Sequence, residues 1–290
     1  MAMNNENKVL ACVDQSHFAA TVGDYAGWAA RRMDAPLEFL HVIERQLAPD
    51  AGQDHSGAIG LDAQDALMSR LTLEDETRSR AQREAGRVFL NHLRQQALAA
   101  GVNAVDVRQR HGALEETLAE QQASVRLFVL GRRGASAELN QRALGRHLEW
   151  VVRAVSRPIL VVGDSYTEPQ RVLLAFDGSS VMRRGVEMIA ASPLLRGLPI
   201  HVLTVDKPQA VARPRQVAWA QQTLEAAGFQ VSAEVVAGEP AQVINQVLQA
   251  RGADLLAMGA YSHSPLRSVL LGSRTRDLLR AVKLPTLLLR

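Results

Sequence analysis

Small and hydroxyl residues near the C-terminus have the types and spacing of a phosphate-binding loop. The run from Met258 to Thr275 reads MGAYSHSPLRSVLLGSRT and contains Gly259, Ser262, Gly272 and Ser273. Glycine at a strand end lets the backbone approach a ligand closely, and the free N–H groups at a helix start bind anions. An apolar run at 253–258 precedes this loop and a helical pattern at 273–282 follows it, so the sequence predicts an anion pocket here.

A similar loop occurs about 130 residues earlier in the chain. Gly131 and Gly134, in the run GRRG, follow an apolar stretch, and ten residues separate Gly134 from Gly145. Arg132, Arg133 and Arg146 are candidates for pairing with phosphates, and solvated arginines on a basic loop are the alternative.

An aspartate directly follows the first apolar run of each half of the chain. Asp14 occurs in KVLACVDQS and Asp177 in RVLLAFDGS. Ligands of open parallel sheets bind at the carboxyl ends of strands, where these carboxylates can accept hydrogen bonds from a sugar hydroxyl. Ser16 and Ser179, two residues further on, are candidate caps of the next helix, and helix capping alone is the alternative explanation of the Asp-x-Ser pattern.

These loops and aspartates belong to an internal repeat. The first runs, at 8–16 and 171–179, match each other, and so do LGRHLEWVVRAVSRPILVV (144–162) and LGSRTRDLLRAVKLPTLLL (271–289). The sequence therefore predicts a tandem duplication, with domains at 1–164 and 165–290 joined near the polar segment 163–170. The first copy is longer and carries a long insertion near 45–84. We expect an excursion loop followed by a charged helix at about 71–100, either over the ligand crevice or as a plain surface insertion.

Each copy alternates apolar runs with helical stretches, which predicts βαβ units in a doubly wound α/β domain with a five-stranded parallel sheet and helices on both faces. Pro158 and Pro285 stop the helix before each last strand. In the first copy we expect strands at 9–13, 37–42, 104–108, 127–130 and 159–162. In the second copy we expect them at 172–176, 200–205, 230–236, 254–258 and 286–289.

The composition indicates a globular protein without nucleic acid or membrane as a partner. Of the residues, 47% are hydrophobic and only 4% aromatic, and 33 basic residues nearly balance 30 acidic ones without forming a basic block. The single cysteine, Cys12, excludes an internal disulfide and reads as a buried strand thiol. The polar start and the lack of a long apolar run predict a cytoplasmic protein. His147, His201 and His263 lack metal-ligand spacing, so no metal site is expected.

The loops, aspartates and repeat together resemble the universal stress protein family over nearly the whole chain. ATP-binding members carry Gly, two residues, Gly, nine residues, then Gly-Ser or Gly-Thr. The second half keeps this spacing from Gly259 to Gly272-Ser273, with Ser262 in place of the second glycine. If that glycine needs a positive φ, Ser262 costs about 1–2 kcal/mol. The first half keeps Gly131 and Gly134, but one extra residue precedes Gly145 and Arg146-His147 replaces the Gly-Ser pair.

The resemblance implies two adenine nucleotide alpha hydrolase-like domains that bind ATP or another adenine nucleotide, with or without Mg²⁺. It places Asp177 and Asp14 at the ribose, the backbones of Val205 and Val42 at the adenine edge, and Thr275 at the phosphates. Because the last strand commonly pairs two such domains, 159–162 and 286–289 are expected to join the copies as a pseudo-twofold dimer within the chain, and a homodimer is a further option.

The expected function is that of a nucleotide-binding regulatory or protective protein of the stress response, acting as a binding module without catalytic residues. The second half is the favoured site because it keeps the Gly-Ser helix start. One alternative is a slow ATPase that uses His263, beside Arg267, or the loop arginines. The other is a ligand-free interaction protein with decayed pockets. No P-loop ending in Gly-Lys-Ser/Thr and no Gly-x-Ser-x-Gly elbow occurs in the chain.

Overall fold

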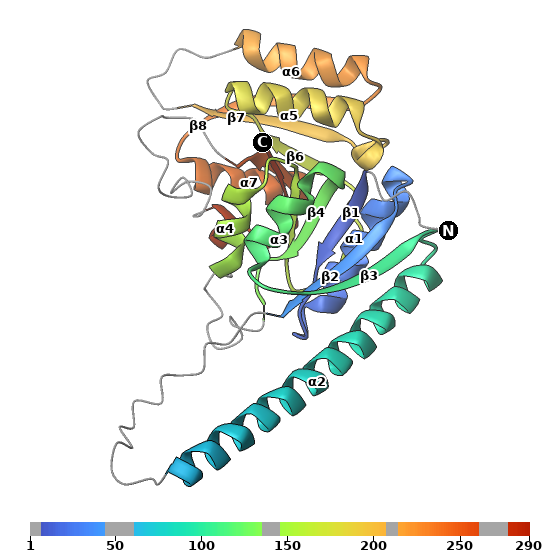
Figure 1. Cartoon of the computed structure of the whole chain (residues 1–290). Coiled ribbons are helices and arrows are strands. Elements are labelled where there is room, and N and C mark those ends of the chain that lie inside the picture. The colour runs from blue at the N-terminus through green and yellow to red at the C-terminus, as the bar shows by residue number, and fades with distance from the viewer. Residues whose placement is uncertain (1–6, 44–60, 135–145, 207–213, 261–277) are drawn as a thin grey trace.

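The computed structural model describes residues 7–43, 61–134, 146–206, 214–260 and 278–290, in which ten strands form one continuous sheet with helices on both faces (Figure 1). The strand order is β3-β2-β1-β4-β5-β10-β9-β6-β7-β8. The first half (β1 to β5) and the second half (β6 to β10) therefore repeat the same order outward from the middle of the sheet. Within each half all neighbouring strands are parallel, which confirms the predicted pair of doubly wound α/β units.

Every strand that the sequence predicts is present, with ends shifted by a few residues at most. The first half contains β1 (Lys8–Cys12), α1 (Ala19–Met33), β2 (Leu37–Ile43), α2 (Leu61–Ala99), β3 (Val105–His111), α3 (Leu114–Gln121), η1 (Gln122–Ser124), β4 (Val125–Gly131), α4 (Arg146–Ala154) and β5 (Ile159–Val162). The second half contains β6 (Val172–Ala175), α5 (Ser180–Ala191), η3 (Pro193–Leu195), β7 (Ile200–Asp206), α6 (Pro214–Ala226), β8 (Val231–Ala237), α7 (Pro240–Arg251), β9 (Leu255–Gly259) and β10 (Thr286–Leu289).

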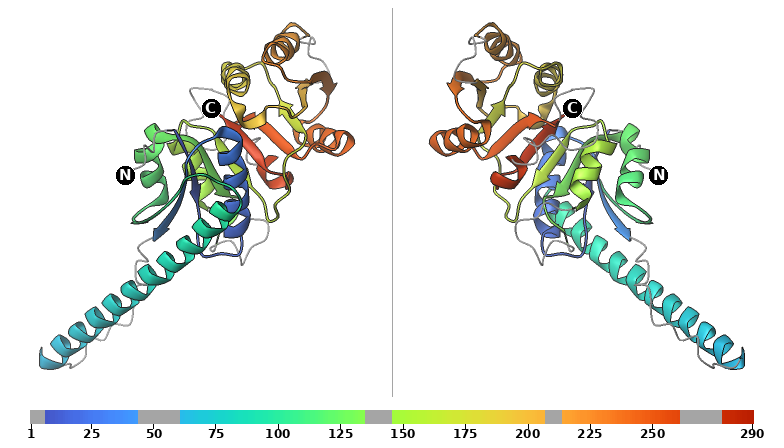
Figure 2. Two further views of the ribbon diagram at one scale, coloured as in Figure 1. Left: turned by 90° about the vertical axis from the view of Figure 1, so that its right-hand side faces the viewer. Right: turned by 90° about the vertical axis from the view of Figure 1, so that its left-hand side faces the viewer.

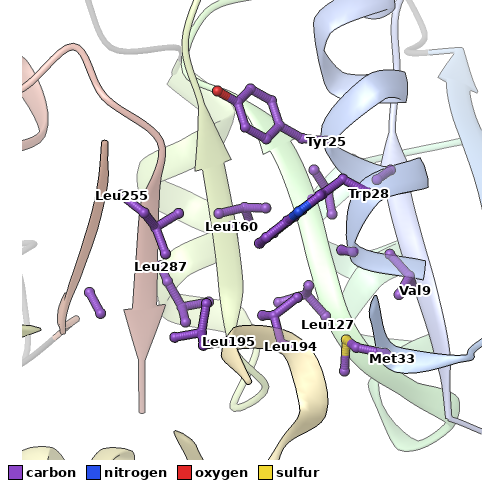
Figure 3. Packing of buried hydrophobic residues seen from close by; sticks show 14 of the residues in the cluster. Val9, Tyr25, Trp28, Met33, Leu127, Leu160, Leu194, Leu195, Leu255 and Leu287 are labelled. Atoms are coloured by element: carbon purple, nitrogen blue, oxygen red, sulfur yellow. The ribbon is translucent and has the colours of Figure 1, made fainter. Parts of the chain in front are cut away.

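Successive residues of each strand point alternately into two apolar cores, one on each face of the sheet. Val9 and Ala11 of β1 lie in the core covered by α1, α2, α5 and α6, whereas Leu10 lies in the core covered by α3, α4 and α7. This alternation follows from the two-residue period of a strand and explains why the runs are apolar throughout. Figure 3 shows Trp28 and Tyr25 of α1 packed beside Leu160 of β5 in the first core.

The two halves join where β5 and β10 pair antiparallel. Leu160 lies opposite Leu287, and Ile159 opposite Leu288, so the strands expected to join the copies do pair. The pairing removes two apolar sheet edges that would otherwise be open to association. Arginines of both halves reinforce the junction. Arg32 of α1 donates to the carbonyl of Leu194 at 3.0 Å, and Arg290 donates to the carbonyls of Val152 and Val155.

Helix α2 is longer than the sequence analysis expects. It begins at Leu61, about ten residues before the predicted start, and its N-terminal part extends away from the sheet (Figures 1 and 2). Its C-terminal part packs on the sheet through the buried side chains of Leu90 and Leu93. Gly86 permits this approach, because a Cβ there would lie 3.2 Å from Cδ2 of His41 and would collide with the amide of Gln109. None of the described helices combines the length and apolar composition needed to cross a bilayer.

Candidate functional site

A pocket of about 820 Å³ lies at the carboxyl ends of β1, β2 and β4. Because β1 pairs with both β2 and β4, the strand order reverses at this point, which is where open α/β sheets bind their ligands. Residues after β1, the start of α1, the end of β2, the end of β4 and one face of α2 form its walls. Its volume lies within the range of small-molecule and cofactor sites.

Four residues that the sequence selects in the first half line this one pocket. They are Asp14, Val42, Gly131 and Gly134. Gly145, the fifth, lies outside the described residues. Gly131 ends β4, and Gly134 follows in the loop, where it lies against Asp14, the aspartate that follows the neighbouring strand β1.

The carboxylate of Asp14 is held in a fixed position. Its Oδ1 accepts a hydrogen bond from the backbone N of Ser16 at 3.1 Å and another from the Ser16 hydroxyl. A Cβ at position 134 would lie 2.5 Å from Oδ2 of Asp14, and a Cβ at position 131 would lie 2.7 Å from the carbonyl oxygen of Arg133. Neither glycine has a positive φ. A side chain at position 131 would therefore collide with the backbone, and one at position 134 would displace the Asp14 carboxylate. Space, and not a positive φ, explains the glycines here.

The two candidate helix caps behave differently. Ser179 caps α5, because its hydroxyl accepts a hydrogen bond from the backbone N of Met182 at 3.2 Å, as expected. The prediction that Ser16 caps α1 is wrong, since α1 begins only at Ala19 with Phe18 at its N-cap. The longer turn after β1 leaves Ser16 before the helix, where its hydroxyl donates to Asp14 instead.

The two central arginines of the GRRG run point to different partners. Arg133 lines the pocket, pairs with Asp164 and lies with its guanidinium 4.8 Å from the centre of the Phe18 ring. Arg132 instead reaches into the second half and donates to the carbonyls of Val282 and, at 2.8 Å, Leu284. The hypothesis that Arg132 pairs with phosphates does not fit this arrangement. Burial lowers the pKa of Arg132 to about 10, with Asp164 acting in the opposite direction, so the group stays charged at neutral pH.

We predict that the variants Arg132→Met and Arg133→Met separate these roles. Arg132→Met removes two charged hydrogen bonds between the halves, so we expect its free energy of unfolding to fall by about 2–3 kcal/mol with nucleotide affinity nearly unchanged. Arg133→Met removes a positive charge from the pocket wall, so we expect mainly a loss of nucleotide affinity. Urea denaturation and calorimetric titration of both variants measure this contrast, and a reversed pattern would contradict the assignment.

Helix α2 contributes a wall that the site prediction omits. Ala81, Gln82 and Ala85 line the pocket, so part of α2 lies beside the crevice. The loop that the sequence places either over the crevice or on the surface lies outside the described residues. No motif marks these residues, and only the length of the insertion signals them. Cys12, at the end of β1, also lines the pocket. Burial, and then the charge of Glu38, raise the pKa of the Cys12 thiol, which keeps it protonated and a poor nucleophile.

The second half places its described candidates in equivalent positions. Asp177 follows β6, Val205 lies near the end of β7 and Gly259 ends β9, and β6 pairs with both neighbours. Oδ1 of Asp177 accepts a hydrogen bond from the backbone N of Ser179 at 2.9 Å. The remaining candidates lie outside the described residues and stay predictions from the sequence: Ser262, Gly272, Ser273 and Thr275, together with His263 and Arg267.

The two buried histidines of the described residues, His41 and His201, have protein partners. In the second half, Nδ1 of His201 lies 2.7 Å from the hydroxyl of Ser232, and its Nε2 lies 2.8 Å from Oε1 of Glu234. Burial acts to raise the pKa of Glu234, but hydrogen bonds from His201 and Arg251 outweigh it and lower that pKa. Over the described ranges, no group of three or more His, Cys, Asp or Glu side chains is arranged to hold a metal ion.

Comparison with known proteins matches both halves of the chain to the same family. The model of the universal stress protein family matches residues 6–163 and 168–290. Universal stress protein Slr1230 of Synechocystis sp. (strain ATCC 27184 / PCC 6803 / Kazusa) is 31% identical over 288 residues, which cover 97% of this chain and 99% of that protein.

Two solved structures share the fold across nearly the full length. A universal stress protein from Archaeoglobus fulgidus DSM 4304 aligns with a TM-score of 0.70 and 17% identity, over 98% of this chain and 96% of its own. A putative universal stress protein from Pseudomonas aeruginosa UCBPP-PA14 aligns with a TM-score of 0.61 and 17% identity, over 98% of this chain and 94% of its own.

Proposed function

The chain belongs to the universal stress protein family as a tandem pair of domains, and we propose that it binds an adenine nucleotide in the pocket of its first half. The observation that carries this proposal is the convergence of Asp14, Val42, Gly131 and Gly134 on one pocket of about 820 Å³. Asp14, Gly131 and Gly134 were selected by type and spacing, and Val42 by the family resemblance. The strands bring them to the point where the sheet order reverses.

The residue roles are those that the family resemblance implies, and the chemistry of the pocket walls is compatible with them. The fixed carboxylate of Asp14 accepts hydrogen bonds from ribose hydroxyls, and the backbone of Val42 borders the adenine edge. The apolar side chains of Val22 and Leu40 give the base a low-polarity surface. The backbone of the GRRG run then lies toward the phosphates, where Arg133 supplies a positive charge.

A second nucleotide site in the other half forms part of the proposal. Asp177, Val205 and Gly259 would serve it together with Ser262, Gly272, Ser273 and Thr275. We also propose a domain boundary near residue 164, a cytoplasmic location and ATP as the first nucleotide to test, with and without Mg²⁺. A homodimer of the whole chain stays a prediction.

The proposed output is binding without turnover, so that the protein reports or protects through its bound state. Native mass spectrometry of freshly purified protein tests this directly. We expect an added mass equal to that of AMP, ADP or ATP, and its ratio to protein gives the number of occupied sites. If only the bare chain is seen, even after millimolar ATP is added, the ligand-free interaction protein becomes the better description. Steady release of phosphate from ATP would favour the slow ATPase instead.

A further inference from the structure

A second cavity, of about 190 Å³, lies between the two halves and away from the nucleotide pocket. Its walls come from the end of α1, from β4, from the end of α5 with η3, and from β10. Figure 3 shows Leu127, Leu194, Leu195 and Leu287 gathered at this junction. The walls are almost entirely aliphatic or thioether side chains, including Met33, so water has few partners there.

One rim of this cavity is basic. Arg126 lines both the apolar cavity and an adjoining hollow of about 440 Å³, which Gln122, Ser156 and Arg157 also line. No aspartate or glutamate lines either space. Within the described part of the chain, Arg126 has neither a hydrogen bond nor an ion pair, so its guanidinium keeps its donors for another group.

Two neighbouring side chains add positive charge and a hydrogen-bond donor to this rim, and neither of them bonds to Arg126. Arg157 donates from Nε to the carbonyl of Gln122 at 3.1 Å, which holds a second positive charge beside the hollow. On the opposite wall, the hydroxyl of Ser192 accepts from the backbone N of Leu194 at 3.3 Å, so its own proton is left to donate. The site therefore combines a small apolar interior with donors and positive charge at its mouth.

We propose that this cavity binds a small aliphatic monocarboxylate, with its chain in the apolar interior and its carboxylate on Arg126. A carboxylate fits the planar guanidinium fork through two parallel hydrogen bonds, and the apolar walls exclude a larger polar ligand. An apolar cavity of about 150 Å³ accepts benzene, so this slightly larger space suits a chain of about six to eight carbon atoms.

The position of the cavity gives such a ligand a structural effect. It would touch β4 and α1 of the first half together with η3 and β10 of the second. A ligand that binds only the folded, joined arrangement stabilises it by mass action. Octanoate is therefore expected to raise the thermal unfolding temperature of the full chain.

Isothermal titration calorimetry with sodium octanoate tests this proposal independently of nucleotide. We expect a 1:1 complex with a Kd of about 0.1–1 mM, weakened at least about tenfold when the neutral analogue octanamide replaces octanoate. Arg126→Gln is expected to weaken octanoate binding by a similar factor. Ala191→Phe, which fills the rim from an exposed position, is expected to remove it.

The matched control is Arg184→Gln, which removes an exposed arginine of α5 that lines neither space. This variant is expected to bind octanoate like the unmodified protein. Circular dichroism of each variant reports whether the chain is folded. Absence of binding up to about 10 mM octanoate, or equal binding by folded Arg126→Gln, would overturn the proposal.

Discussion

Replacing Gly134 with alanine is expected to lower the affinity of the first-half pocket for adenine nucleotide at least about 100-fold. The added Cβ would lie 2.5 Å from Oδ2 of Asp14, so the carboxylate has to leave the position in which Ser16 holds it. The colliding atom is the end of a side chain, and the loop backbone is not forced apart. We therefore expect a large loss of binding with only a small loss of stability, measured by calorimetric titration with ATP and by urea denaturation.

Gly23→Ala provides the matched control for this change. It adds the same methyl group in α1, where the nearest atoms are 3.6 Å away on Leu93 and 3.7 Å away on Phe39, at ordinary contact distance. We expect this variant to bind nucleotide normally and to be no less stable, because alanine favours a helix over glycine. Equal binding by Gly134→Ala and Gly23→Ala would show that the aspartate and glycine loop do not form the site.

Replacing Glu38 with glutamine is expected to lower the free energy of unfolding by about 3–5 kcal/mol. Glu38 of β2 pairs with Lys8 of β1 at 2.9 Å, and their side chains are only 1% and 3% exposed. Arg108 of β3 also reaches the same carboxylate oxygen, at 3.1 Å. The variant would leave the ammonium of Lys8 buried with neutral acceptors alone, namely the amide oxygen introduced at position 38 and the side chain of Gln121 at 3.4 Å. Urea denaturation followed by circular dichroism measures the change.

Glu84→Gln is the control for this buried pair. Glu84 and Arg87 lie closer together, at 2.7 Å, but on the exposed surface of α2, where water screens both charges. We expect the midpoint of urea denaturation to stay the same within error for Glu84→Gln and to fall clearly for Glu38→Gln. Similar shifts of the urea midpoint in both variants would contradict the claim that burial makes the Glu38–Lys8 pair more important for stability than the exposed pair.

The sheet was the most predictable part of this protein. Strands buried on both faces appear as continuous apolar runs, and the repeat confirmed each run by a partner elsewhere in the chain. The pairing of 159–162 with 286–289 could also be predicted from the sequence, because each last strand would otherwise expose an apolar edge. These features depend on local composition and on order along the chain, which a single sequence contains.

The parts that sequence reasoning missed depend on contacts between distant residues. Arg132 stands in a loop that suits phosphates, yet its acceptors are carbonyls about 150 residues later in the chain. Ser16 has the type of a helix cap, but α1 begins only at Ala19 with Phe18 at its N-cap, so the helix start lies beyond Ser16. Gln82 lines the pocket because of the path that α2 takes across the sheet. The polar sequence of α2 does not specify that path, so this contribution could not be predicted.

The structure also changes how the two loops compare. The sequence favoured the second half, because it keeps the Gly272-Ser273 helix start, although those residues lie outside the described part of the chain. The first half keeps both glycines, and a side chain at position 134 would displace the Asp14 carboxylate. Ser262 stands at the equivalent position of the motif in the second half and lies outside the described residues.

Photoaffinity labelling with 8-azido-ATP, followed by peptide mapping, tests most directly whether the first-half pocket binds an adenine nucleotide. We predict labelled peptides from the end of β2 and the adjoining face of α2, with labelling suppressed by excess ATP and lost in Gly134→Ala. Labelling confined to the second half, or first-half labelling that excess ATP does not suppress, would contradict the assignment of this pocket.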